Sequence, residues 1–282
     1  MSTESDNQMQ QAIDGYDKHI GSGTRPIAVW LATSGQVEGI DSPDAVILDN
    51  ACGTALVAEE IIRHGRKVNK PLPRIYAADI KDNLTALASF KIQQLDVGDR
   101  VSVHTTPGEK LEFEDDLFTH SITSCGLPFF ADADAGAREI YRTLRSGGTA
   151  VITSAAHLSY IETIIVPGHL AARPAEPSFV NPLDPRWRDE AAMEKCMRDA
   201  GFKNVRSLIH TAYYAGETRE EALETLLGLW WLIKPEWTEE EKGRFADKAK
   251  ERLEEATVEC TMWDGRPGFG FEMGFIVVIG QK

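Results

Sequence analysis

The sequence predicts an α/β protein built around a doubly wound, mostly parallel β-sheet. Short apolar runs alternate with segments whose apolar residues recur at helical spacing, and this alternation repeats five times in about 155 residues. Two of the runs end in an acidic residue, Asp49 and Asp79, and a turn of small residues at 51–55 joins the first run to its helix. Strands that alternate with helices form parallel sheets through right-handed crossovers, so we expect helices on both faces.

Each element of the repeat is marked by its own residues. Val46-Ile47-Leu48 is apolar throughout, as in a strand buried on both faces, and the following helix is closed by Gly65. Ser146-Gly147-Gly148 predicts a turn into the fifth strand. The expected strands are 46–48, 75–78, 101–104, 121–124 and 149–153, and the clearest helices are 56–62, 84–95 and 133–144.

The segments on either side of the repeat differ from it. Residues 1–11 are polar and predict a disordered tail, while apolar residues at 12–20 and 27–31 predict a helical lid, so we separate 1–40 from a domain at 41–282. After residue 156 we expect helical insertions around 157–200 and 216–260. Their elements are a helix at 187–200, a strand at 205–213, helices at 219–233 and 238–256, and a terminal strand at 275–279.

Composition excludes several classes of protein. Of the 282 residues, 44 are acidic and 30 basic, and the net charge of −14 disfavours binding to nucleic acid. The four cysteines, Cys52, Cys125, Cys196 and Cys260, are scattered and the histidines lack ligand spacing, so we expect neither a disulfide framework nor a metal site. No apolar run approaches the roughly 18–20 residues of a membrane span, and the N-terminus lacks a signal peptide. We therefore expect a cytoplasmic protein without membrane contact, of unknown oligomeric state.

The turn after the first strand is the strongest local signal. The dinucleotide fingerprint G-x-G-x-x-G is absent, because Gly53 is the single glycine of the turn, and no P-loop follows. The pattern D-x-(G/A)-x-G-x-(G/A) is met by Asp49, Ala51, Gly53 and Ala55. A plain buried strand followed by a helix remains the alternative. This stretch resembles the first motif of class I S-adenosylmethionine-dependent methyltransferases.

The second acidic strand end, Asp79, has two interpretations. A carboxylate at this position can accept two hydrogen bonds from ribose hydroxyls, as in dinucleotide-binding βαβ units. The alternative is a helix N-cap, which aspartate also favours. Because Asp82 can cap the following helix, we favour the ribose interpretation.

Four motifs in order extend the resemblance over roughly residues 10–156. They are the acidic glycine turn, the second acidic strand end, a Gly-Glu loop and a Gly-Gly turn before the fifth strand. The stretches LDNACG, FTHSITSCGLPFFADADA and WLIKPEWTEEE are similar to fungal methyltransferases of secondary metabolism, notably those that S-methylate gliotoxin-type dithiols. The resemblance implies a Rossmann-like, seven-stranded sheet with an antiparallel last strand and a helical lid, and S-adenosyl-L-methionine as cofactor.

The resemblance also implies roles for individual residues. Asp49 would orient the methionine ammonium, Asp79 the ribose, and Ile80 would pack on adenine, while Tyr16 could cover the ligand or pack as a core residue. The other implied cofactor contacts are Asn50, Ala51, Cys52, Gly53, Gly108, Glu109, Ser124 and Cys125. This chain departs from the family at Pro107, where an adenine-binding Asp or Asn is frequent, and at Ala51 and Ala55, which replace frequent glycines.

The acceptor site is less defined. A thiol acceptor, with a pKa of about 8.5, needs little activation, whereas a hydroxyl acceptor needs a base. His157 is the one candidate for this base, and the alternative is that it is a loop or core histidine. Leu127 is expected to face the acceptor. Trp230 and Trp231 cannot share one helical face, so one could face the ligand, although core packing is the alternative for each.

We therefore expect S-adenosylmethionine-dependent methylation of a small molecule, with a thiol slightly favoured over an amine or hydroxyl. The first alternative is a regulatory or interaction protein that binds the cofactor on a methyltransferase fold without turnover. A nicotinamide-dependent oxidoreductase is a third possibility, which the missing G-x-G-x-x-G disfavours.

Overall fold

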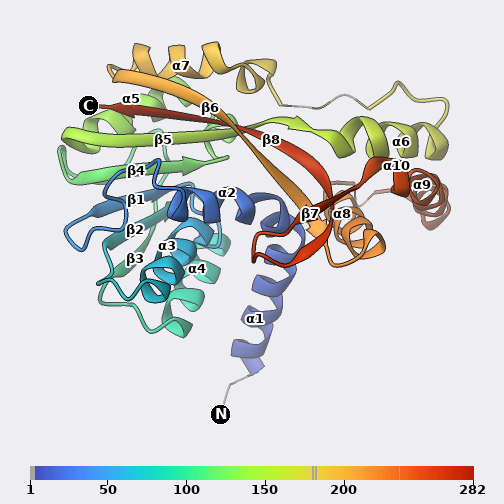
Figure 1. The fold of residues 1–282 in the computed structure, drawn as a ribbon, viewed down its shortest axis with the longest axis horizontal. Coiled ribbons are helices and arrows are strands. Elements are labelled where there is room, and N and C mark those ends of the chain that lie inside the picture. Colours follow the sequence, from blue (N-terminus) through green and yellow to red (C-terminus); the bar gives the residue numbers. More distant parts are fainter. Residues whose placement is uncertain (1–3, 180, 182, 235) are drawn as a thin grey trace.

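The computed structural model describes residues 4–179, 181, 183–234 and 236–282. These residues form one mixed sheet in the order β3-β2-β1-β4-β5-β8-β6, with β7 added to β8 (Figure 1). The strands are β1 Val46–Asn50, β2 Arg74–Asp79, β3 Val101–Thr105, β4 Phe118–Ser124, β5 Leu144–Leu158, β6 Lys203–Gly216, β7 Val258–Thr261 and β8 Pro267–Gln281.

Strand directions confirm the predicted doubly wound sheet. β1 to β5 pair in parallel, while β8 runs antiparallel to both β5 and β6. The chain passes outward from β1 through β2 to β3 and then returns to β4 on the other side of β1. Such a reversal leaves a crevice at the carboxyl ends of β1 and β4, where ligands bind in open α/β sheets. The short β7 was not predicted.

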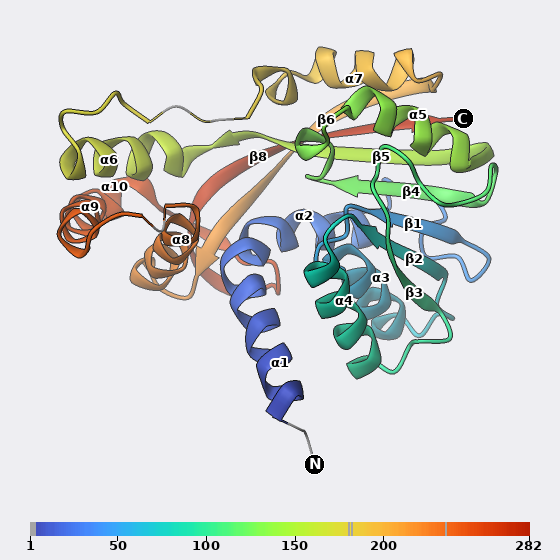
Figure 2. The same cartoon turned by 180° about the vertical axis from the view of Figure 1, so that it is seen from behind.

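Two layers of helices bury the sheet. One face is covered by α2 (Ser22–Thr33), α3 (Leu56–Lys67) and α4 (Asp82–Gln94), and the other by α5 (Ala133–Thr143) and α7 (Glu190–Asp199), as Figures 1 and 2 show. Ile47 packs with the first layer and Leu48 with the second, and both are fully buried. Because neighbouring strand residues face opposite sides, an uninterrupted apolar run is what a doubly covered strand requires.

The three strands at one edge are longer than expected. β5, β6 and β8 have 15, 14 and 15 residues and extend beyond the parallel sheet toward a group of helices (Figure 1). The predicted fifth strand, 149–153, covers only the part of β5 that pairs with β4. The helices at the far end are η3 (Ile161–Ile165), α6 (Val166–Ala172), α8 (Arg219–Ile233), α9 (Glu239–Glu251) and α10 (Leu253–Ala256). Short 3-10 turns lie at η2 (Leu127–Phe129) and η4 (Pro185–Arg188).

The N-terminal segment is helical rather than disordered from Glu4 onward. α1 (Glu4–Tyr16) continues through the π-helical turn η1 (Asp17–Gly21) into α2, and α1 projects from the body of the molecule (Figure 2). Ile13 is 4% exposed, so one face of α1 has a partner in the fold. The predicted tail at 1–11 is therefore wrong for residues 4–11, and residues 1–3 lie outside the described chain.

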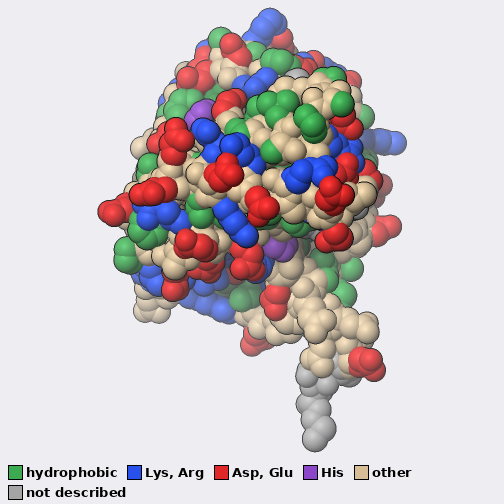
Figure 3. Space-filling view, turned by 90° about the vertical axis from the view of Figure 1, so that its right-hand side faces the viewer, with side chains coloured by type: hydrophobic (Ala, Val, Ile, Leu, Met, Phe, Trp, Pro, Cys, Tyr) green, Lys and Arg blue, Asp and Glu red, His purple; other side chains and the backbone are tan. Residues whose placement is uncertain are grey.

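The described surface carries charges of both signs. On the face shown in Figure 3, acidic and basic side chains alternate without forming a large basic patch. Among the described residues, no helix combines the length and the apolar character needed to cross a bilayer.

Candidate functional site

A cavity of about 460 Å³ lies at the carboxyl ends of the parallel strands, at the predicted crevice. The turn after β1, the end of β2 and the end of β4 form one end of it, and η1 and α2 lie over it. Nine predicted cofactor residues line this cavity: Tyr16, Asp49, Ala51, Cys52, Gly53, Asp79, Ile80, Ser124 and Cys125. The sequence motifs thus converge on one hollow.

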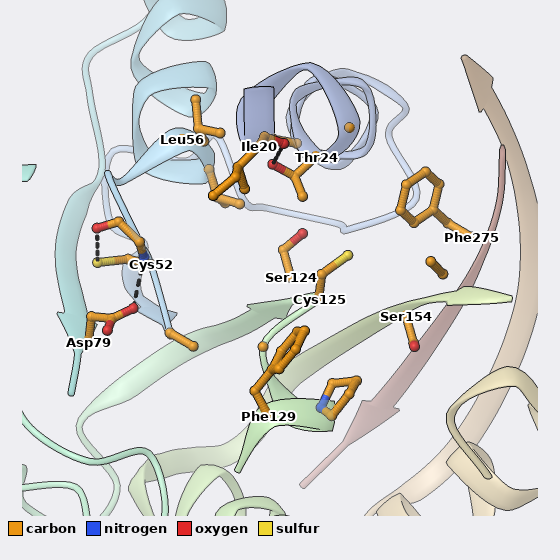
Figure 4. Close-up of a pocket in the computed structure, with 18 of the residues that line it drawn as sticks. Ile20, Thr24, Cys52, Leu56, Asp79, Ser124, Cys125, Phe129, Ser154 and Phe275 are labelled. Atoms are coloured by element: carbon orange, nitrogen blue, oxygen red, sulfur yellow. Dashed lines mark hydrogen bonds between the residues drawn. The ribbon is translucent and has the colours of Figure 1, made fainter. Parts of the chain in front are cut away.

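The turn after β1 is wound in a left-handed conformation. Ala51, Gly53 and Ala55 have φ angles of 57°, 56° and 61°. Glycine adopts this conformation without cost, whereas alanine does so at a cost of roughly 1–2 kcal/mol. The Gly53 N–H donates to Asp79 Oδ2 at 2.9 Å, which ties the turn to the end of β2 (Figure 4). Strain of this kind is retained where a backbone must approach a ligand.

Asp49 is a buried carboxylate at the end of β1. Its Oδ2 accepts a hydrogen bond from the Ala58 N–H at 3.2 Å, and it is 1% exposed. Burial raises the pKa of Asp49 to about 7 against the lowering effect of the Ala58 N–H, and the charge of Asp79 raises it further. A carboxylate held this close to protonation favours a cationic ligand group, which would stabilise its ionised form.

Asp79 lines the cavity, and each of its two carboxylate oxygens already accepts one backbone hydrogen bond. Oδ2 accepts from Gly53, and Oδ1 accepts from the Lys81 N–H at 3.0 Å. Ionised carboxylate oxygens each accept more than one hydrogen bond, so capacity remains for two ligand hydroxyls. Asp79 does not cap the following helix, because the N-cap of α4 is Lys81 and no side chain caps it. The expectation that Asp82 supplies this cap is therefore wrong.

A second cavity of about 170 Å³ adjoins the first beyond Asp79. Gly108 and Glu109 line it, as predicted, together with Ile80. Glu109 Oε1 accepts from the Ala131 N–H at 2.7 Å, and the ring of Phe130 occupies the space where a side chain on Gly108 would lie. Asp79 lines both cavities and therefore lies where they meet, and Glu109 adds a further carboxylate in the smaller one.

The sequence of the chain matches a known family. The family model described as the ubiE/COQ5 methyltransferase family matches residues 28–216, about two thirds of the chain. The chain belongs to this family. It is a methyltransferase, and S-adenosylmethionine is its cofactor. The residues present fit a molecule of this kind, because buried Asp49 favours a cationic group, Asp79 has capacity for hydroxyl donors, and a smaller cavity adjoins them.

Individual proteins are similar to parts of this methyltransferase in sequence or in fold. Methyltransferase ktnA of Aspergillus niger is 21% identical over 237 residues, which cover 76% of this chain and 78% of ktnA. The bifunctional biotin biosynthesis protein BioHC of Teredinibacter turnerae is 29% identical over 102 residues, 36% of this chain, and the chain spans only 18% of BioHC. A Haemonchus contortus phosphoethanolamine N-methyltransferase 2 solved with S-adenosyl-L-methionine has the same fold, with a TM-score of 0.51 and 16% identity; the match covers 89% of this chain and 51% of that one.

The far end of the larger cavity is apolar. It is bounded by α2, by the extended parts of β5, β6 and β8, and by Leu229 of α8. Figure 4 shows Ser124 and Cys125 at the end of β4, below the helical segment of Ile20 and Thr24, with Phe275 beside them. Among the described lining residues the charged side chains are Asp49, Asp79 and Lys81, all at the ends of β1 and β2. The part of the cavity beyond Cys125 is therefore uncharged.

Two predicted residues are buried away from both cavities. Asn50 donates to Thr123 Oγ1 at 3.4 Å, since it follows Asp49 in the strand and faces the opposite side. Leu127 is 1% exposed and packs in the core under α5 and α7. Its neighbours Phe129 and Phe130 line the cavity instead.

His157 does not face the cavity. It lies in the extended part of β5, opposite Gly274 of β8, and its side chain is exposed. A bulge between Ala155 and His157 shifts the register at this point. The expected role as a base is therefore not supported by its position.

The two tryptophans of α8 lie in an aromatic cluster and not on this cavity. Trp230 is 3% exposed and stacks on Phe245 with ring centroids 5.5 Å apart, and Trp231 meets Phe245 edge to face at 5.4 Å. Trp237 contacts both. Both tryptophans therefore pack in the core, which was the predicted alternative, and neither lines the cavity.

The lid is anchored by a buried ionic cluster that the sequence analysis did not find. We use this name for Asp17, Arg25, Glu59, Glu60 and Lys91. Arg25 binds Asp17 at 2.8 Å, Glu59 at 3.1 Å and Glu60, while Lys91 binds Asp17 at 2.9 Å and Glu59 at 3.1 Å. Asp17 follows Tyr16 and also accepts from Thr54 Oγ1 in the cofactor turn at 3.0 Å. The cluster therefore joins the lid, the turn and helices α3 and α4.

Proposed function

We propose that this methyltransferase acts on a small, uncharged, apolar metabolite and that a thiol is the favoured acceptor. The observation that carries this proposal is the uncharged end of the cavity beyond Cys125. A carboxylate, ammonium or phosphate group on the acceptor would be desolvated there without a partner. Since no described carboxylate or histidine faces that space, the acceptor must lose its proton by its own acidity, which favours a thiol.

We assign the cofactor end by the same geometry. Asp49 would face the ammonium, Asp79 the ribose, and the smaller cavity the adenine, with Ile80 and Gly108 at its walls. S-adenosylmethionine would supply an electrophilic methyl group for the acceptor atom, and its sulfur would keep the electron pair of the broken bond. The acceptor proton leaves to solvent beforehand. Alignment of the two reactants in the cavity can supply on the order of 7–11 kcal/mol.

Radiolabelled methyl transfer tests the proposal. We would offer 2-naphthalenethiol and 2-naphthol in parallel, then metabolite extracts, and locate the label by mass spectrometry. We expect faster methyl transfer to the thiol than to the naphthol, and we expect EDTA to leave the rate of transfer unchanged. Transfer confined to oxygen, nitrogen or carbon would overturn the thiol assignment. Cofactor binding without transfer to any acceptor would favour the regulatory alternative.

Cofactor affinity should depend on pH through Asp49. Its pKa of about 7 in the free protein must fall when a cation binds beside it, so binding releases a proton below pH 7. We expect the Kd to rise by up to about tenfold per pH unit as the pH falls below 7, and to level off above it. Calorimetry with S-adenosylhomocysteine at several pH values measures this. Asp49→Asn, which keeps an oxygen for the Ala58 N–H, should bind weakly with a flat profile, and a steep profile in that variant would contradict the assignment.

The ribose assignment is tested at Asp79. Asp79→Ala leaves the ribose hydroxyls and the Gly53 N–H unpaired, which typically costs about 1–3 kcal/mol, or roughly 5- to 150-fold in Kd. Asp82→Ala is the matched control, because Asp82 is an exposed aspartate three residues further along. Equal affinity of the two folded variants would show that Asp79 does not hold the ribose.

A further inference from the structure

Two tyrosines stand at the uncharged end of the cavity, and they differ in their hydrogen bonds. The rings of Tyr160 and Tyr214 meet edge to face with centroids 5.9 Å apart, and both residues line the cavity. The Tyr214 hydroxyl donates to the His19 carbonyl at 2.6 Å and also lies 3.2 Å from the Thr225 carbonyl. Tyr214 therefore links η1 to α8 through its hydroxyl.

The Tyr160 hydroxyl has no hydrogen-bond partner among the described residues. Its ring is fixed between Tyr214 and Phe271, whose ring lies 6.2 Å away at 79°. The residue lies two positions beyond Leu158, the last residue of β5, and is the N-cap of η3, with helical φ and ψ of −63° and −18°. Tyr160 therefore lines the cavity with a ring held by two aromatic contacts and with a hydroxyl that has no partner among the described residues.

The surroundings of this hydroxyl define what it can do. Burial raises the pKa of Tyr160 far above its ordinary value, and the neighbouring Cys125 raises it further. The group stays protonated at any physiological pH, so it acts as a hydrogen-bond donor and not as a base. Cys125 lies next to Ser124 at the end of β4, the position at which the methyl group is expected to be presented.

We propose that Tyr160 selects the acceptor, by donating a hydrogen bond from its hydroxyl to a neutral oxygen of an apolar molecule that lies in the cavity beside Cys125. This inference rests on the proposed function and narrows its substrate class to apolar molecules with such an oxygen near the methylated atom. An acceptor without this oxygen leaves the hydroxyl unpaired in a buried site, and an unpaired buried donor is costly. Discrimination at such a site is stronger than discrimination by apolar shape alone.

The test compares two probes that differ by one group. 2-Methoxynaphthalene carries an ether oxygen where 2-ethylnaphthalene has a methylene, so the first accepts a hydrogen bond and the second cannot. Equilibrium dialysis would measure both Kd values on the full chain saturated with S-adenosylhomocysteine. We expect wild type to prefer the ether by about fivefold, Tyr160→Phe to lose this preference, and Tyr214→Phe to keep it.

Each result has a definite meaning. Loss of the preference in Tyr160→Phe alone supports the proposal. Absence of a preference in wild type, or its persistence in Tyr160→Phe, overturns it. Melting temperatures separate a structural role, because Tyr214→Phe removes the bond to the His19 carbonyl and should melt earlier, whereas Tyr160→Phe should melt as wild type does. The measurement does not depend on methyl transfer. If the thiol proposal fails, the two Kd values still test the role of Tyr160.

Discussion

Substituting valine for Gly53 is expected to abolish cofactor binding while the sheet stays folded. Gly53 has a φ of +56°, and a Cβ atom there would lie 2.9 Å from Tyr16 Oη. A branched side chain would therefore be strained in its own backbone and would displace the tyrosine that covers the turn. Calorimetry with S-adenosylhomocysteine should show no measurable heat of binding.

A matched substitution separates backbone strain from the loss of the site. Gly35 also has a positive φ of +70°, but no atom lies within 4 Å of the position of its Cβ. Gly35→Val should lose stability and keep cofactor affinity, whereas Gly53→Val should lose affinity as well. If both variants bind the cofactor equally, the turn after β1 does not hold it.

The convergence of Asp49, Gly53 and Asp79 on one cavity was predictable because its signals are local. Asp49, Gly53 and Asp79 lie on short strands and one turn, and parallel topology brings strand ends together without further information. The errors there follow from geometry at a single residue. Asn50 faces away because successive strand residues alternate, and the turn at 127–129 points Phe129 rather than Leu127 at the cavity.

The acceptor end could not be predicted in the same way. Tyr214 and Phe275 come from β6 and β8, and Tyr160 follows the end of β5. These strands meet only because they continue beyond the parallel sheet. Nothing in the local pattern sets how far a paired strand extends, since that depends on its partner. The same pairing, with its bulge after Ala155, determines where His157 points.

Charge clusters are equally hard to read from a sequence. Glu59 and Glu60 resemble the solvated charges of an amphipathic helix, yet they are 9% and 4% exposed. Burial alone would raise the pKa of Glu59, but Arg25 and Lys91 outweigh it and lower the pKa to about 2. Residues more than 30 positions apart supply this compensation, and only the folded lid brings them together.

Arg25→Ala is expected to destabilise the fold by about 3–5 kcal/mol, because the buried Glu59 and Glu60 lose their buried arginine partner. Lys91 still pairs with Glu59, and Glu60 keeps only the exposed Arg63. Arg63→Ala is the matched control: Arg63 contacts the same two carboxylates at 2.6 and 3.4 Å, but its side chain is 55% exposed. Exposed pairs contribute about 0–1 kcal/mol, so this variant should stay close to wild type. Urea denaturation measures both values.

The pH dependence of the Arg25→Ala deficit identifies its cause. In wild type the lowered pKa of Glu59 gives stability that is present above its unfolded pKa and is lost as the pH falls toward about 2. In Arg25→Ala the buried carboxylates should have raised pKa values, so the folded variant binds more protons than its unfolded chain and loses stability as the pH rises. The two stability curves should therefore converge in acid and diverge toward neutral pH. A deficit that does not change with pH would mean that Arg25 acts by packing on Trp263, whose ring lies 5.1 Å from its guanidinium, and not by charge.

Because Asp17 links the buried ionic cluster to Thr54, the variant should also bind S-adenosylhomocysteine more weakly at neutral pH than Arg63→Ala does.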